Sequence, residues 1–248
     1  LYHNIRKQKG IDFEDYEVGL PMPDAKLTFS DATTATVETS DNDHGNVLNI
    51  KSINSSVNDT MDIKLLSSVK GATCNIAELD MCVLPGTENG AVFRVLLYND
   101  MYLLSINVNG DTVMLHEDSY QYDASYKHDL GARAKVGEWF NVRIEYYGGT
   151  RDTVRAKIFF NGECIAVTNH FFNKQKDTAV PNLDYTYLRL ETVKTKDLNI
   201  LVDNVLTESN YRMYVPETNE KLARNVDAPE GKQTVHRFEE TAVGNLPS

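Results

Sequence analysis

The chain has 248 residues, of which 41% are hydrophobic, a content that is adequate for a globular core and excludes wholesale disorder. It carries 25 Lys and Arg against 36 Asp and Glu, and the resulting net charge of −11 argues against a general nucleic-acid surface. No apolar run approaches the roughly 18 residues that a membrane span needs, so we expect neither nucleic acid as a partner nor membrane insertion.

The first ten residues, LYHNIRKQKG, are polar and basic and too short to fold alone, so residues 1–10 are expected to be an arm or linker. From there onward apolar and polar residues alternate nearly everywhere, which is the period of β-strands. The stretch WFNVRIEYY (139–147) shows the pattern clearly. Asn-Gly pairs at 109–110 and 161–162 predict tight hairpins. Hairpin-linked strands with no sustained helical stripe predict an all-β, two-sheet antiparallel sandwich.

The end of the chain departs from this pattern. We expect residues 11–208 to form the sandwich and residues 209–234, which gain Pro, Glu and Asn, to form a linker. The phrase FEDYEVG that begins at Phe13 then returns as FEETAVG at Phe238, and Leu-Pro follows in both copies. Residues 235–248 are therefore predicted to begin a second, truncated copy of the same domain. The alternative is that a common strand-and-turn phrase arose twice by chance.

The stretch VGEWFNVRIEYYGGTRDTVRAKIFFNGECIAV (136–167) resembles laminin-G-like and concanavalin-A-like jelly rolls. Those families show a G-x-W-h-x-h strand, a turn, a second strand and an Asn-Gly hairpin. The matching positions are Gly137, Trp139, Val142, Ile144, Asn161 and Gly162. The resemblance implies a jelly-roll sandwich of the concanavalin-A-like type, with Trp139 in a strand that feeds the core. It says less about function, because this fold hosts lectins, sugar-binding modules, glycosidases, adhesion domains and spacers.

Glu78 and Asp80 form an E-x-D motif that would lie on one face of a strand. Endo-β-glucanases of the laminarinase and lichenase type carry E-x-D-x-E or E-x-D-x-x-E on such a strand, and the last Glu is their acid/base. Retaining hydrolysis needs two carboxyl groups about 5 Å apart. In this chain the third position holds Cys82 or Val83, so the proton donor is missing. We therefore expect no enzyme activity, and a glycoside hydrolase relative that lacks its acid/base is the lesser alternative.

Calcium has two candidate sites. The loop TSDNDHGN (39–46) supplies side-chain oxygens at alternate positions, but Asp and Asn also dominate ordinary turns, and this loop lacks the spacing of a twelve-residue calcium loop. A turn is the favoured interpretation there. The family resemblance implies a second site, in which Glu14 or Asp15 on the first strand meets Asp203 on the last, because those strands are often neighbours in such modules.

Sugar-binding faces stack pyranose rings on flat aromatic side chains. The chain has 13 Tyr but only one Trp, so tyrosines that cluster in YNDMY and SYQYDASY are the candidates. They are Tyr98, Tyr102, Tyr120, Tyr122 and Tyr126. The alternative is that these tyrosines cover the core with their hydroxyl groups in water.

The favoured function is a non-catalytic carbohydrate-binding or adhesion module of a larger, tandem-repeat protein that is extracellular or lies on a cell or virion surface. Its partner would be a polysaccharide or glycan, and repetition would give weak sites avidity. The alternative is a purely structural module, such as a spacer in a surface fibre or a subunit that decorates a virus particle, whose partners are neighbouring copies of itself. The three cysteines have no metal-type spacing and are expected to be buried thiols.

Overall fold

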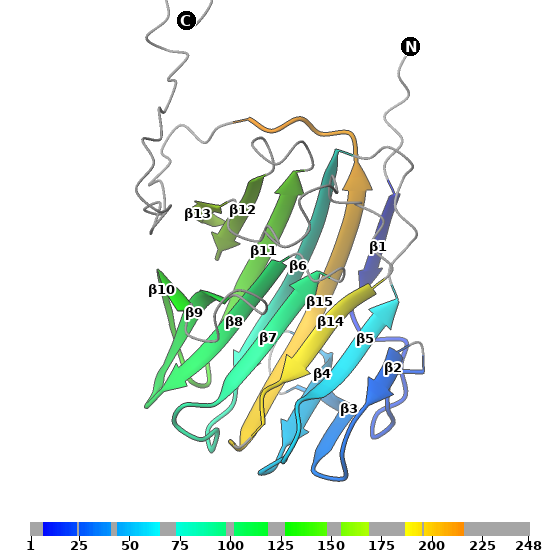
Figure 1. Cartoon of the computed structure of the whole chain (residues 1–248). Helices are drawn as coiled ribbons and strands as arrows, with labels where there is room; N and C mark the ends of the chain where they lie inside the picture. Colours follow the sequence, from blue (N-terminus) through cyan, green and yellow to red (C-terminus); the bar gives the residue numbers. More distant parts are fainter. Residues whose placement is uncertain are drawn as a thin grey trace, which may run out of the picture.

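The computed structural model describes residues 7–23, 25–40, 44–64, 73–97, 102–118, 127–147, 155–168, 187–194 and 196–215. Within these ranges the chain forms fifteen β-strands and no helix (Figure 1). Accordingly, the described part of the chain contains no helix that is long and apolar enough to cross a membrane. The strands assemble into two antiparallel sheets, which we call sheet A and sheet B.

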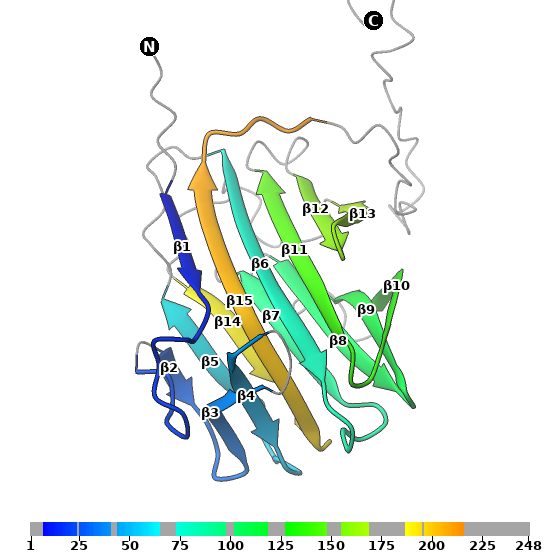
Figure 2. The ribbon, with the colours of Figure 1, turned by 180° about the vertical axis from the view of Figure 1, so that it is seen from behind.

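Sheet A has eight strands. Seven follow the order β13-β12-β11-β6-β15-β4-β3, and β1 also pairs with β15. The strands of sheet A are β1 (Lys7–Ile11), β3 (Thr33–Thr39), β4 (Asn46–Ser52), β6 (Cys74–Val83), β11 (Trp139–Tyr147), β12 (Arg155–Phe160), β13 (Glu163–Thr168) and β15 (Leu198–Asn210). Figure 2 shows this sheet in front.

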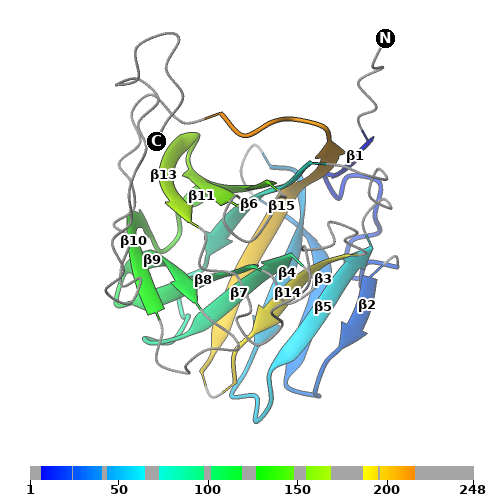
Figure 3. The same ribbon diagram turned by 45° about the horizontal axis from the view of Figure 1, so that its top comes forward.

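Sheet B has seven strands in the order β10-β9-β8-β7-β14-β5-β2. They are β2 (Ala25–Thr28), β5 (Asp59–Lys64), β7 (Val92–Leu97), β8 (Tyr102–Asn109), β9 (Thr112–Asp118), β10 (Lys127–Lys135) and β14 (Tyr187–Thr192). Sheet B lies in front of sheet A in Figure 1, and the tilted view of Figure 3 shows the two layers face to face. The predicted jelly-roll sandwich is confirmed.

The core lies between the sheets and follows from the alternation in the sequence. Phe140, Val142 and Ile144 of β11 point inward and are buried, and they meet inward side chains of sheet B such as Phe93 and Leu104 in one apolar cluster. Because successive side chains of a strand point to opposite faces, the intervening residues of β11 must lie on the outer face of sheet A.

Strand β11 feeds the core, as the resemblance implied, but Trp139 itself does not point into it. Phe140 takes the inward position at the start of β11, so its neighbour Trp139 points outward. There it packs against a small apolar cluster that includes Cys82 and Leu201, and its ring stacks on His44 with the ring centroids 3.7 Å apart.

Strands β1 and β15 extend the sandwich beyond the range expected from the sequence. Residues 7–11, most of which were expected to belong to an arm, form β1 and pair with β15 along their whole length. Strand β15 continues to Asn210, inside the predicted linker. Residues 211–215, which we call the crossing segment, then run across the ends of β6 and β11 (Figures 1 and 2). The predicted second copy at 235–248 lies outside the described residues and stays a prediction.

All three cysteines are free thiols, but the prediction that they are buried holds for only two of them. Cys74 and Cys82 are buried in β6, and Cys164 in β13 is half-buried. Burial raises the pKa of the Cys74 thiol to about 12, which keeps it protonated and unreactive.

Candidate functional site

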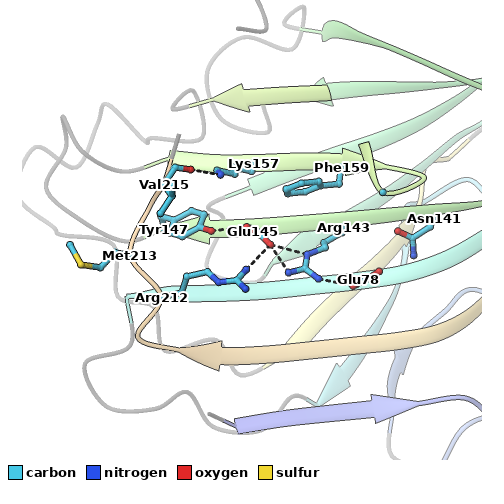
Figure 4. A pocket seen from close by; sticks show the side chains of 11 residues that line it. Glu78, Asn141, Arg143, Glu145, Tyr147, Lys157, Phe159, Arg212, Met213 and Val215 are labelled. Carbon is cyan, nitrogen blue, oxygen red and sulfur yellow. Dashed lines mark hydrogen bonds and ion pairs between the residues drawn. The ribbon is translucent and has the colours of Figure 1, made fainter. Parts of the chain in front are cut away.

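A groove of about 600 Å³ lies on the outer face of sheet A (Figure 4). Its floor is formed by the outward residues of β11, and β6 and β12 supply the residues beside them. The crossing segment forms one end. The lining residues are Glu78, Asn141, Arg143, Glu145, Tyr147, Lys157, Phe159, Gly162, Arg212, Met213 and Val215.

Strand pairing sets the polar side chains in rows across the floor. Arg143 of β11 stands opposite Glu78 of β6 on one side and Phe159 of β12 on the other. Arg143 donates to Glu78 over 3.2 Å, and its guanidinium carbon lies 5.9 Å from the centroid of the Phe159 ring. The row therefore joins a carboxylate, a guanidinium group and an aromatic ring on three adjacent strands.

Glu145 is the centre of the hydrogen-bond network. Its side chain is buried and accepts from Tyr147 Oη over 2.6 Å, from Arg143 Nε over 2.9 Å and from Arg212 Nη1 over 3.1 Å. Burial alone would raise the pKa of Glu145, but these hydrogen bonds and the charges of Arg143 and Arg212 together lower it. Glu145 therefore stays ionised at neutral pH.

Tyr147 and Arg143, the neighbours of the ionised Glu145, both stay protonated. Burial, followed by the hydrogen bond to Glu145, raises the pKa of the Tyr147 hydroxyl group. Burial opposes the charge on Arg143, but the hydrogen bond to Glu145 and the neighbouring carboxylates outweigh it and raise the pKa of the guanidinium group. The pKa values of Glu145 and Tyr147 are both shifted away from neutral pH, and the lining residues that the structure describes include no His or Cys.

The crossing segment is tied to the floor by several contacts. Lys157 Nζ donates to the carbonyl oxygen of Val215 and lies 5.1 Å from the ring centroid of Tyr214. Tyr214 in turn packs edge-on against Tyr147, with ring centroids 5.4 Å apart. These contacts fix the end of the groove.

The E-x-D motif lies on the outer face of β6, as predicted, but its two carboxylates have different partners. Glu78 binds Arg143 in the groove, whereas Asp80 accepts from the side-chain amides of Asn141 and Asn204, each over 2.8 Å. The third position holds Cys82 or Val83, neither of which has a carboxylate. Cys82 packs on the outer face of the sheet, and Val83 belongs to the core between the sheets.

The predicted calcium ligands converge only in part. Strands β1 and β15 are neighbours, but Glu14 and Asp15 lie in the turn after β1, not in the strand. Glu14 accepts from the backbone amide of Asn46 over 2.9 Å, and the buried Asp203 lies 2.8 Å from His44 Nδ1. Burial raises the pKa of Asp203. Among the residues that the structure describes, no group of three or more His, Cys, Asp or Glu is arranged to hold a metal ion.

Most of the other predicted ligands fall outside the described ranges. These are Tyr98, Tyr120, Tyr122, Tyr126, Asp41 and Asp43. Tyr102 begins β8, where its backbone pairs with Leu97, and nothing further is described for its side chain. The tyrosine and calcium sites therefore stay predictions.

Sequence reasoning missed the groove. The alternation in WFNVRIEYY predicts a polar outer face for this strand, but alternation alone does not indicate a binding site there. The signal that was available is the presence of Arg143 and Glu145 on that side, two opposite charges at alternate positions of one strand.

No protein-family model and no curated protein matches the chain in sequence. Solved structures do share its fold. Cellulose induced protein Cip1 is 9% identical with a TM-score of 0.53, covering 80% of this chain and 96% of that chain. A carbohydrate esterase from the Shiga toxin-encoding bacteriophage phi24B is 10% identical with a TM-score of 0.52, covering 75% and 90%. A protein of unknown function from Shewanella oneidensis MR-1 is 10% identical with a TM-score of 0.51, covering 85% and 90%. At such identities the likeness shows the fold, a two-sheet jelly-roll sandwich, and nothing finer.

Proposed function

We propose that the chain is a non-catalytic carbohydrate-binding module and that the groove on sheet A holds the glycan. The observation that carries the proposal is the row of Glu78, Arg143 and Phe159, which sets fixed polar groups beside an aromatic ring in an open groove. Small-molecule sites of this kind combine apolar surface with a few positioned polar groups that provide specificity.

The polar groups retain capacity for sugar hydroxyl groups. Glu78 uses Oε2 to bind Arg143, which leaves Oε1 as an acceptor. Asn141 donates its amide to Asp80, and its carbonyl oxygen is left to accept from a ligand. Phe159 is half-buried and offers a ring edge or face to a pyranose. These groups lie on three adjacent strands, so one glycan can contact all of them.

Two further considerations support a binding module over an enzyme. The pKa of Glu145 is lowered and that of Tyr147 is raised, so neither group has a pKa near neutral pH, where a general acid or base is most effective. The phage protein that shares the fold is named a carbohydrate esterase, which makes glycans the first ligand class to test but does not transfer its chemistry. The proposal includes a setting in a larger surface or extracellular protein with repeated domains.

A glycan array with the full chain tests this function. We expect wild type to bind a subset of glycans, and Phe159→Ala to weaken that binding on the order of fivefold or more, equivalent to about 1 kcal/mol. Lys51→Gln is the matched control, because Lys51 is exposed on β4 of the same sheet but does not line the groove. An array silent for wild type, or equal binding by Phe159→Ala, would contradict the proposal.

A structural module is the second candidate function. Three apolar side chains of the crossing segment are exposed: Tyr211 at 40%, Met213 at 78% and Val215 at 65%. Exposed apolar groups that gather in one place are typical of contact surfaces. A cryo-EM structure in which copies of the chain join through more than about 1,000 Å² would favour this role over sugar binding.

A further inference from the structure

We propose that the glycan bound in the groove carries a carboxylate group, as a uronic acid does, and that Arg212 of the crossing segment is the residue that selects it. This inference rests on the proposed function and names the ligand class of the same groove.

The groove differs in charge from the rest of the chain. The described residues that line it include three cations, Arg143, Lys157 and Arg212, and two carboxylates, Glu78 and Glu145, which together give one net positive charge. The chain as a whole carries −11. A positive site on an acidic protein concentrates anions locally and discriminates against neutral competitors.

The hydrogen-bond pattern shows which cation remains available. Glu145 already accepts from Arg143, Tyr147 and Arg212, so its role is to hold these side chains in place. Arg143 donates from all three of its nitrogen atoms, to Glu145 and to Glu78. The guanidinium group of Arg212 makes one hydrogen bond, from Nη1 to Glu145, and its side chain is 52% exposed. Arg212 therefore has an unused edge.

That edge suits a planar carboxylate. A guanidinium group presents parallel N–H donors that match both oxygens of a carboxylate, a geometry that a Lys ammonium group does not offer. Figure 4 shows Arg212 reaching from the crossing segment along the floor toward Glu145. An acid group bound there would leave its sugar ring over the floor, and the next residues of the glycan would extend past Glu78 toward Asn141.

The crossing segment holds Arg212 ready for this contact. The carbonyl oxygen of Arg212 accepts from Thr73 Oγ1 over 2.9 Å, and its backbone amide donates to Asn210 Oδ1 over 2.7 Å. Val215 is tied to Lys157 beyond it. Because the backbone is fixed on both sides of Arg212, little order has to be gained when a ligand binds.

The test is isothermal titration of the full chain with polygalacturonate and alginate, with the neutral glucans laminarin and dextran, and with dextran sulfate. We expect the polyuronates to bind more tightly than the neutral glucans. Arg212→Gln should weaken polyuronate binding roughly tenfold, Arg212→Lys should fall between that variant and wild type, and the control Lys51→Gln should bind as wild type does. Thermal melting of each variant establishes that it folds.

The outcomes separate the two proposals. Binding of neutral glucans but not of polyuronates, or an affinity for polyuronates that Arg212→Gln leaves unchanged, overturns the carboxylate inference and leaves the carbohydrate-binding function standing. The carboxylate inference is also overturned if Lys51→Gln weakens polyuronate binding as much as Arg212→Gln does and dextran sulfate binds best. Binding would then depend on the overall charge of the polymer and not on its carboxylate groups. Failure of every glycan in this panel and in the array overturns the proposed function itself.

Discussion

Phe13 lies just after the first strand and packs into the core. Removing its ring measures how much the phrase FEDYEVG (13–19) contributes to the stability of the fold. The ring is completely buried and packs beside Tyr16, with ring centroids 6.0 Å apart, although the backbone at Phe13 is left-handed with φ of 63°. Phe→Ala substitutions in cores typically cost about 3–5 kcal/mol. For a domain of this size, about 2–4 °C per kcal/mol gives a fall in Tm of roughly 6–20 °C for Phe13→Ala.

The same substitution at Phe238 tests the predicted second copy. If residues 235–248 begin another domain, Phe238 has no place in this core, and Phe238→Ala should shift Tm by no more than about 2 °C. Thermal unfolding followed by circular dichroism measures both variants, and Phe13→Leu is the control that keeps much of the buried volume. A loss of stability at Phe238 equal to that at Phe13 would refute the second copy and place the C-terminal phrase in this domain.

A transplant extends the test to the whole phrase. Replacing residues 13–19 by the sequence of 238–244 keeps Phe13, Glu14 and Gly19 but changes Tyr16, whose ring packs beside Phe13, to Thr. Glu14 accepts from the backbone amide of Asn46, and Gly19 has φ of 88°, a conformation that side chains disfavour. Because the Tyr16 ring is lost, we expect the transplanted chain to melt somewhat below wild type, and a chain with the same seven residues scrambled to melt well below both. Equal Tm values for the transplanted and the scrambled chain would show that the repeat of this phrase does not reflect a shared structure.

Three further predictions concern Asp203, Glu145 and Gly45. If Asp203 helps to hold calcium, EDTA should lower Tm and Asp203→Ala should abolish that effect. An unchanged Tm in EDTA would contradict the calcium site. Because the folded-state pKa of Glu145 is lowered, its ionised form stabilises the fold above the unfolded pKa, and this contribution is lost as pH falls through the folded pKa. The stability difference between wild type and Glu145→Gln in urea should therefore shrink below about pH 4, and a constant difference would contradict the assignment. At Gly45, with φ of 60°, an added Cβ would meet Glu14 Oε1 at 1.9 Å, so Gly45→Ala should lower stability by about 1–2 kcal/mol while Gly10→Ala, with open space around it, should change it less.

The fold was accessible from the sequence because alternation is a local property. The nine residues of β11 show it without knowledge of any partner, and the structure buries Phe140, Val142 and Ile144 as the pattern requires. The family resemblance was less reliable for a single side chain. It implied only that the strand of Trp139 feeds the core, whereas the alternation in the same strand puts Trp139 on the face opposite Phe140. The physical pattern was the better guide at this position.

The groove was not accessible in the same way, because it depends on which strands become neighbours. Arg143 and Glu78 are 65 positions apart in the sequence. If β6 and β11 paired one residue out of register, the outward side chains of the shifted strand would point inward. Nothing in the stretch around Glu78 shows that an arginine will stand opposite it. Pairs that depend on register have to be seen in the structure.

The crossing segment shows a second limit of pattern-based reasoning. Residues 211–215 have no strand period, and the sequence therefore predicts a linker there. A segment that packs across strand ends needs no period, because single contacts fix it: Arg212 to Glu145, Tyr214 to Tyr147, and Val215 to Lys157. Loss of alternation marks the end of a sheet, but it does not mark the end of a domain. Here the irregular segment supplies the end of the groove and its most available cation, consistent with the general tendency of binding residues to lie on connections that a rigid scaffold positions.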